Sequence, residues 1–298
     1  MACRLLRADR LAVNHARMIK IDAHQHFWKY SPAGYGWIND AMSVLKRDFL
    51  PDDLEVLLKA NGFDGSIAVQ AQQTIQETRR LLQFANENEF IKGVVGWVDL
   101  RSQQVHDRLQ ELSANKKLVG VRHVVQDERD DEFMLKPDFR RGIAQLAAFG
   151  LVYDLLLHPR HLPVAVKLVR EFPDQRFVLD HIAKPAIADH LMEPWASDIR
   201  ELARFPNVVC KLSGMVTEAR WQQWAHDDFC PYLDVVLDAF GPSRLMIGSD
   251  WPVCTLAADY ASTLGIVQTF IAGLSTPDQN AILGGNCARV YGLDLRLR

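Results

Sequence analysis

Eight short apolar segments recur along the chain, and this repeat limits how the chain can fold more than any other feature. Most of the segments are continuously apolar rather than alternating, which is typical of parallel strands that are covered on both faces. Parallel neighbours need long crossover connections, which are usually helical. The segments lie at 19–24, 65–71, 92–100, 118–125, 151–158, 176–181, 207–214 and 244–250.

Segments with helical periodicity separate most of these predicted strands. The first of them begins at Pro51 and ends at Gly62, the usual punctuation of a helix. A strand–helix repeat with eight strands predicts a single-domain α/β protein, a closed (β/α)8 TIM barrel. An open doubly wound sheet is the alternative, but no glycine-rich dinucleotide loop follows the first strand. The predicted helices span 51–62, 76–88, 137–150, 162–173, 194–206 and 231–242.

The domain organisation predicted from the sequence is an N-terminal tail, 1–17, followed by one barrel, 18–298. No linker rich in proline, glycine or serine divides the chain of 298 residues. The tail has four arginines and one acidic residue, and it lacks the apolar core of a secretory signal. The tail is compatible with a mitochondrial-type presequence. It is also compatible with a translation start placed upstream of the natural one, which would then be Met18.

The composition excludes several classes of partner. The 34 basic and 37 acidic residues are interspersed and give a net charge of −3, so we expect no nucleic-acid partner. No apolar run reaches the roughly 18 residues that span a bilayer, so we expect no membrane segment. The five cysteines are scattered and odd in number, which favours reduced thiols and a cytoplasmic location. The expected partner is a small molecule, and a homo-oligomer is compatible with the sequence.

Titratable side chains stand where the predicted strands end, and in such barrels this end carries the active site. The first strand ends in His24 and His26, whose spacing of two places both imidazoles on one face. They can reach one ion or one substrate atom, or they can be satisfied by hydrogen bonds within the core.

Three further strands bring polar groups to the same end. The sixth ends at His181, the eighth at Asp250 and the fifth at His158. Imidazoles with a carboxylate suit a zinc-like divalent ion, and they also suit general acid–base chemistry. We therefore predict one functional site at this end of the barrel.

Other polar or aromatic residues at this end are weaker candidates for substrate contact. Arg122 and His123 are adjacent on the fourth strand, so only one of them can face the lumen. Aromatic residues of the long connection 27–50, Trp28 among them, line a pocket or simply cover the barrel end. The remaining candidates are Gln70, Gln72, Lys184, Lys211 and Ser213.

Several motifs between Ile19 and Leu293 resemble the amidohydrolase superfamily, and within it the amidohydrolase-2 branch. The motifs are IDAHQHFW, LLLHPRHL, FVLDHIAKP, KLSG, MIGSDWPV and GGNCARVYGL. DHIAKP and GSDWP resemble the sugar-lactone hydrolases, which act on fuconolactone or rhamnonolactone, and the related pyrone-dicarboxylate lactonases.

The resemblance implies a barrel hydrolase that opens a small cyclic ester. The family's water-activating aspartate corresponds to Asp250, its first-strand pair to His24 and His26, its strand-six histidine to His181, and its strand-five histidine, where present, to His158. Binuclear members carry a bridging carboxylated lysine on strand four, and the segment 118–125 has no lysine. We therefore expect at most one divalent ion, zinc first, bound by His24, His26 and Asp250 with or without His158; no metal at all is the other possibility.

The mechanism that we hypothesise is attack of water on the lactone carbonyl, with Asp250 taking the proton. His24 and His26, with or without a metal, polarise the carbonyl, and His181 binds the carbonyl or the ring oxygen. Trp28, Arg122 and Lys184 are the expected substrate-binding residues. The alternatives are a metal-dependent decarboxylase of the same branch, a barrel that binds sugar acids without turnover, and a phosphotriesterase-like or amide hydrolase, which the missing lysine disfavours.

Overall fold

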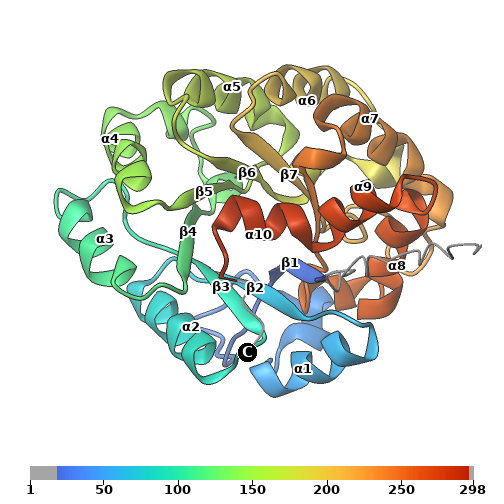
Figure 1. The fold of residues 1–298 in the computed structure, drawn as a ribbon, viewed down its shortest axis with the longest axis horizontal. Coiled ribbons are helices and arrows are strands. Elements are labelled where there is room, and N and C mark those ends of the chain that lie inside the picture. The colour runs from blue at the N-terminus through green and yellow to red at the C-terminus, as the bar shows by residue number, and fades with distance from the viewer. Residues whose placement is uncertain (1–18, 295–298) are drawn as a thin grey trace, which may run out of the picture.

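The computed structural model describes residues 19–294, and the predicted tail 1–17 lies outside the described residues. Eight parallel strands form one sheet in which each strand pairs with its successor. They lie in a ring surrounded by helices (Figure 1), which confirms the predicted (β/α)8 barrel. The strands are β1 (Ile21–Gln25), β2 (Gly65–Val69), β3 (Ile91–Gly96), β4 (Leu118–His123), β5 (Val152–Leu155), β6 (Phe177–Leu179), β7 (Val208–Leu212) and β8 (Leu245–Ile247).

The barrel closes between β1 and the segment that follows β8. The backbone N–H of Asp250 donates to the carbonyl of His24 at 2.8 Å, and the N–H of His26 donates to the carbonyl of Trp251 at 2.7 Å. The later strands are shorter than predicted, since β6 stops before Asp180 and β8 stops before Gly248. His181 and Asp250 consequently lie on connecting segments beyond the strands.

The surrounding helices include all six that the sequence predicts and several that it does not. Thr74 caps α2 by accepting a hydrogen bond from the backbone of Glu77. α3 was not predicted from the sequence, because it has neither a proline at its start nor a glycine at its end. None of the helices in residues 19–294 is both long and apolar enough to cross a membrane. The helices are α1 (Pro51–Ala60), α2 (Ile75–Glu87), α3 (Val105–Ser113), α4 (Pro137–Leu146), α5 (Leu162–Glu171), α6 (Trp195–Ala203), α7 (Cys230–Phe240), α8 (Tyr260–Ile271), α9 (Thr276–Asn280) and α10 (Asn286–Tyr291).

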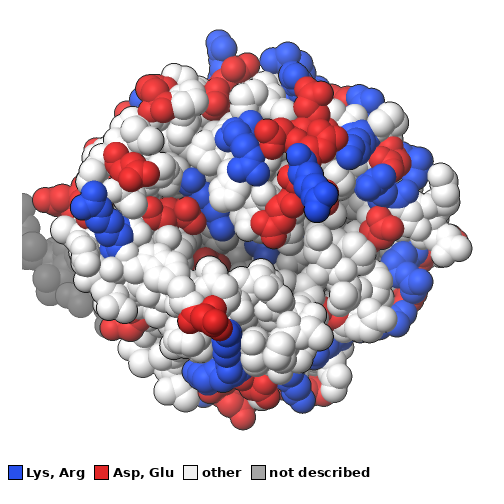
Figure 2. Space-filling model, turned by 180° about the vertical axis from the view of Figure 1, so that it is seen from behind, with Lys and Arg blue, Asp and Glu red and all other residues white. Residues whose placement is uncertain are grey.

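The short C-terminal helix α10 covers one end of the barrel. Figure 1 shows it across the middle of the ring, and Cys287, Val290 and Tyr291 pack there against the valines and isoleucines of the barrel interior. The opposite face is hollowed near its middle (Figure 2). The fold therefore leaves one end of the barrel open to a ligand, the end at which the strands terminate.

Candidate active site

A cavity of about 560 Å³ lies at the open end of the barrel. This volume is typical of small-molecule sites. Its wall combines polar groups from the strand ends with apolar side chains from the loops, Trp37 and Met42 among them. The polar residues of this wall include His26, Gln70, Arg122, His181, Lys184 and Asp250.

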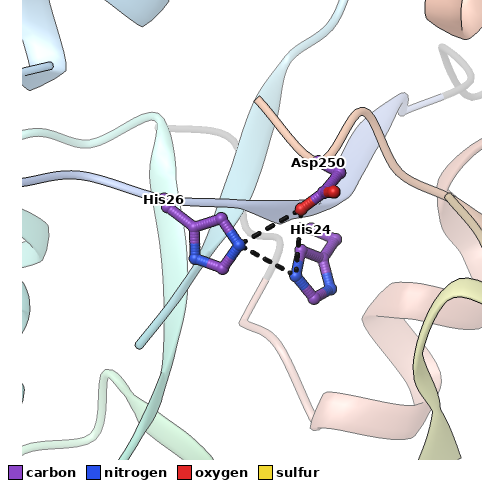
Figure 3. A group of neighbouring side chains, drawn as sticks. All are labelled: His24, His26 and Asp250. Atoms are coloured by element: carbon purple, nitrogen blue, oxygen red, sulfur yellow. Dashed lines mark hydrogen bonds and ion pairs between the residues drawn. The ribbon is translucent and has the colours of Figure 1, made fainter. Parts of the chain in front are cut away.

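His26 and Asp250 line this cavity, and together with the fully buried His24 they form one cluster of possible metal ligands (Figure 3). His24 lies in β1 and His26 directly follows it, and their imidazoles approach each other with their Nε2 atoms 3.2 Å apart. Asp250 Oδ1 lies 3.2 Å from Nε2 of His26 and 3.7 Å from Nε2 of His24. All three side chains are buried, so each interaction acts in a medium of low dielectric constant.

The backbone of Asp250 is left-handed, with φ of +57°. The prediction that Asp250 ends a strand is wrong, because β8 stops at Ile247 and Asp250 lies in the segment that closes the barrel. A left-handed conformation costs a non-glycine residue roughly 1–2 kcal/mol. The backbone bond to the His24 carbonyl helps to hold it, and the carboxylate reaches the two imidazoles as a result.

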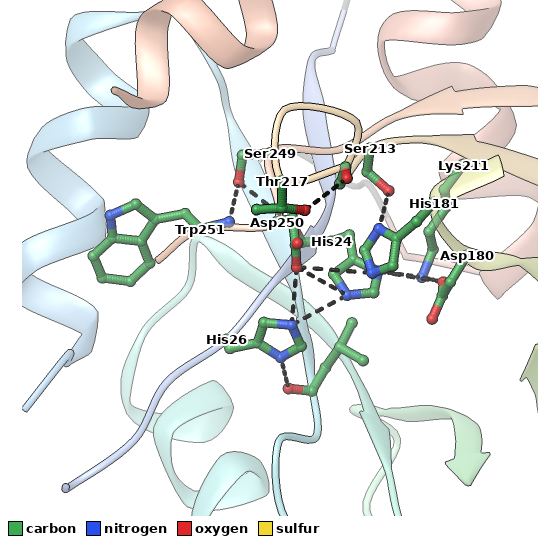
Figure 4. Close-up of polar contacts among 12 residues, drawn as sticks. His24, His26, Asp180, His181, Lys211, Ser213, Thr217, Ser249, Asp250 and Trp251 are labelled. Carbon is green, nitrogen blue, oxygen red and sulfur yellow. Dashed lines mark hydrogen bonds and ion pairs between the residues drawn. The ribbon is translucent and has the colours of Figure 1, made fainter. Parts of the chain in front are cut away.

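His181 brings a third imidazole to the same carboxylate (Figure 4). Its Nε2 lies 3.8 Å from Oδ1 of Asp250, and its Nδ1 lies 2.9 Å from the hydroxyl of Ser213. Gly214, which has a φ of +62°, packs against the ring, and a Cβ there would overlap it. Three Nε2 atoms thus converge on one carboxylate oxygen.

The protonation states of Asp250 and the three imidazoles decide what this cluster can bind. Burial would raise the pKa of Asp250, but the surrounding imidazoles hold it below its usual range, so the group is a carboxylate. Burial lowers the pKa of His181 to about 4 and that of His24 well below its ordinary value, so both are neutral at pH 7. His26 Nδ1 lies 2.8 Å from the carbonyl of Val69 and must donate to it. Its Nε2 therefore faces a carboxylate across 3.2 Å, and either a second proton or a cation has to lie between them.

A second set of possible ligands, His24, Asp180 and His181, is less suited to a cation. Asp180 already pairs with the guanidinium of Arg122 at 3.0 Å and with the ammonium of Lys211 at 3.0 Å. Two fixed positive charges beside this carboxylate repel a further ion. The first set is the better metal site, because no lysine or arginine pairs directly with Asp250 in the described part of the chain.

A layer of buried charged residues lies beneath the site, and the sequence did not predict it as part of the functional site. Lys211 Nζ lies 2.6 Å from Asp154 Oδ2 and 3.3 Å from His24 Nδ1, and Tyr291 donates to Asp154 from α10. Asp22 accepts hydrogen bonds from Ser249 and Tyr260. The signal was present: a charged residue inside an apolar strand segment, as in NVVCKLSG or LVYDLLLH, must find a buried partner.

The structure brings two of the expected substrate-binding residues to the cavity. Arg122 NH1 lies 3.3 Å from His24 Nε2, while NH2 donates to the backbone and side-chain oxygens of Gln70. Lys184 also lines the cavity, with its ammonium 3.9 Å from Glu218 Oε1. His123, next to Arg122, points away and stacks on Phe133, as expected if only one of the pair faces the lumen.

Two other expected residues lie elsewhere. Trp28 is completely buried, donates to the carbonyl of Arg47 and does not line the cavity; Trp37 of the same connection does. The reason is packing, because Trp28 lies in an aromatic cluster beneath the loop. His158 is half-buried, belongs to neither ligand set of the barrel mouth and does not line the cavity. It follows β5 and continues into a short turn whose backbone holds it away from the other imidazoles.

Comparisons with known proteins identify the family of this chain. The family model for amidohydrolases matches residues 21–293. An L-fucono-1,5-lactonase of Burkholderia multivorans is 45% identical over 288 residues, which cover 92% of this chain and 96% of that protein. An L-fucono-1,5-lactonase of Burkholderia ambifaria is 40% identical over 282 residues, with the same coverage. A crystal structure of an amidohydrolase from B. multivorans with bound zinc superposes with a TM-score of 0.89 at 45% identity and covers 93% of this chain and all of that one.

Proposed function

Since the chain belongs to the amidohydrolase family, we propose that it is a hydrolase that opens the cyclic ester of a sugar lactone. The substrate class is supported by the two relatives named L-fucono-1,5-lactonase, which align with nearly the whole chain. L-Fucono-1,5-lactone is therefore the first compound to test, and other aldonolactones follow.

The observation that carries the proposal is the carboxylate of Asp250 at the floor of the cavity. Hydrolysis of a lactone needs a base for the attacking water and positive charge for the carbonyl oxygen. Asp250 is ionised, buried and surrounded by imidazoles, so it can take the proton of a water molecule held at the floor. The cavity is large enough for a six-carbon lactone beside it.

The residues at the floor also fit one divalent metal ion, which His24, His26 and Asp250 would hold. The fit rests on His26, whose Nδ1 donates to a backbone carbonyl while its Nε2 faces a carboxylate, an arrangement that a cation between Nε2 and the carboxylate would stabilise. Imidazole and carboxylate are the ligand types that zinc prefers. Such an ion would supply Lewis acidity toward the carbonyl oxygen. The related structure with bound zinc supports this assignment, and we propose one ion per chain.

The cavity wall provides the remaining groups. His181 stands beside Asp250 and is placed to donate to the carbonyl or ring oxygen of the lactone. Arg122 and Lys184 bring positive charge to the cavity wall, suited to substrate hydroxyls and to the carboxylate that the reaction creates. Gln70 and Gln72 add amide donors and acceptors to the same wall. An arrangement with many polar donors fits a polyhydroxylated substrate.

A pH-indicator assay over a panel of aldonolactones, corrected for spontaneous hydrolysis, tests the proposal. We expect enzyme-dependent proton release with at least one sugar lactone and none with simple aryl esters. Repeating the assay after chelation and after adding back zinc tests the metal. Release of carbon dioxide from an aromatic acid without any lactone hydrolysis would contradict the proposed function.

A further inference from the structure

Four consecutive residues that are not glycine adopt left-handed backbone conformations directly after β6. The φ angles are +55° at His181, +47° at Ile182, +61° at Ala183 and +51° at Lys184. This region is unfavourable for L-residues and most of all for a β-branched one such as Ile182. A run of four therefore persists only if its surroundings hold it.

This left-handed turn directs two of its side chains into the cavity. His181 and Lys184, its first and last residues, line the cavity, whereas Ile182 and Ala183 are completely buried. If the turn relaxed to right-handed angles, the two cavity side chains would leave their present directions. The approach of His181 Nε2 to Asp250 Oδ1, 3.8 Å, depends on the present backbone.

One side chain outside the cavity is bonded to the middle of this turn. The indole N–H of Trp195, at the start of α6, donates to the carbonyl of Ile182 at 2.7 Å. Both residues are buried, so water does not replace this bond easily. The ring centroids of Trp195 and Tyr232 lie 5.2 Å apart, and the Tyr232 hydroxyl shares its one proton between the carbonyl oxygens of Ala186 and Leu191 in the following segment, at 3.4 and 3.3 Å.

We propose that Trp195 is a positioning residue: its hydrogen bond to the Ile182 carbonyl fixes the left-handed turn that presents His181 and Lys184 to the substrate. The part of this inference that concerns turnover rests on the proposed function. Trp195 does not line the cavity, so any effect on catalysis must pass through the turn.

The test is Trp195→Phe, which keeps an aromatic ring against Tyr232 and removes the N–H. The matched control is Trp224→Phe, because the indole of Trp224 donates in the same way to a backbone carbonyl, that of Ala257, at 3.0 Å. We expect Trp195→Phe to lower kcat/KM about tenfold on the best lactone, about 1.4 kcal/mol. The control should lose less than twofold, while both variants show similar small decreases in Tm.

A double-mutant cycle separates positioning from general destabilisation. In a background that carries both His181→Ala and Lys184→Ala, Trp195→Phe should lower kcat/KM less than twofold, because both side chains through which it acts are gone. An equal tenfold loss in both backgrounds would overturn the inference.

A crystal structure of the Trp195→Phe variant tests the backbone claim without any substrate. We expect at least one of the four φ angles to leave the left-handed region, or the His181 ring to move away from Asp250. Four unchanged angles with an unmoved ring would refute the inference. Inactivity of the wild-type protein on every lactone would refute only the proposed function.

Discussion

Replacing Asp250 by asparagine tests the base most directly. The amide has nearly the shape of the carboxylate, so the closing segment and its backbone bond to His24 should persist. An amide cannot take a proton from water at neutral pH. Loss of a general base typically lowers turnover about 10²–10⁴-fold, which corresponds to about 3–5 kcal/mol of transition-state free energy.

We expect a loss of turnover within this range because no other carboxylate that residues 19–294 bring to the cavity can replace Asp250 as the base. Asp127 is the only other carboxylate on the wall of this cavity as the described residues form it, and it is not part of the imidazole cluster. The alternative role for Asp250 is to cap the following loop with its side chain. Its carboxylate contacts in residues 19–294 are with the imidazoles of His24, His26 and His181, which does not support capping.

The assay is kcat on the best lactone, with Tm and metal content measured on the same sample. The exposed Asp174→Asn variant makes the same chemical change away from the cavity and should keep wild-type turnover. A folded Asp250→Asn protein that retains its metal and more than about a tenth of wild-type kcat lies outside the range for a lost base. That result would refute the assignment.

Three further predictions follow from the packing, the buried charges and the metal ligands. Gly214→Ala should lower kcat at least tenfold because its Cβ would displace the imidazole it packs against, whereas Gly265→Ala, with open space around it, should keep both kcat and Tm. Burial raises the pKa of Glu77 to about 7, so the folded protein prefers the protonated carboxyl. The stabilisation from this proton is fully present below about pH 4.5 and is lost as the pH rises through 7. Urea unfolding of Glu77→Gln should therefore show a flatter pH dependence across this window, by up to about 3 kcal/mol, and an unchanged slope would contradict the shift. Elemental analysis should find at most one tightly bound divalent ion per chain, lost in His26→Ala; two ions would show that the second ligand set is also occupied.

The sequence alone determined the architecture and part of the site. The eight apolar segments predicted the barrel, because hydrophobic periodicity is a local consequence of backbone geometry. The spacing of His24 and His26 placed both on one face for the same reason. The strand-end positions of His181 and Asp250 located them at the open end, although neither belongs to a strand in the structure.

Tertiary structure alone decided which charged groups meet. Asp250 lies 224 residues from His26 and reaches it only because the barrel closes. The pairing of Lys211 with Asp154 depends on how β5, β6 and β7 align across the lumen, which no local pattern encodes.

The left-handed turn after β6 is the clearest example of a feature that could not be predicted from the sequence. Local preference opposes that conformation at each of the four residues 181–184, and it is held by an indole from a later helix. Packing likewise buried Trp28 and left Trp37 on the cavity wall, although the two lie in the same connection. Periodicity and spacing report the interactions of residues that are close in sequence. The site depends on free energies of contact between residues that become neighbours only after the barrel has closed.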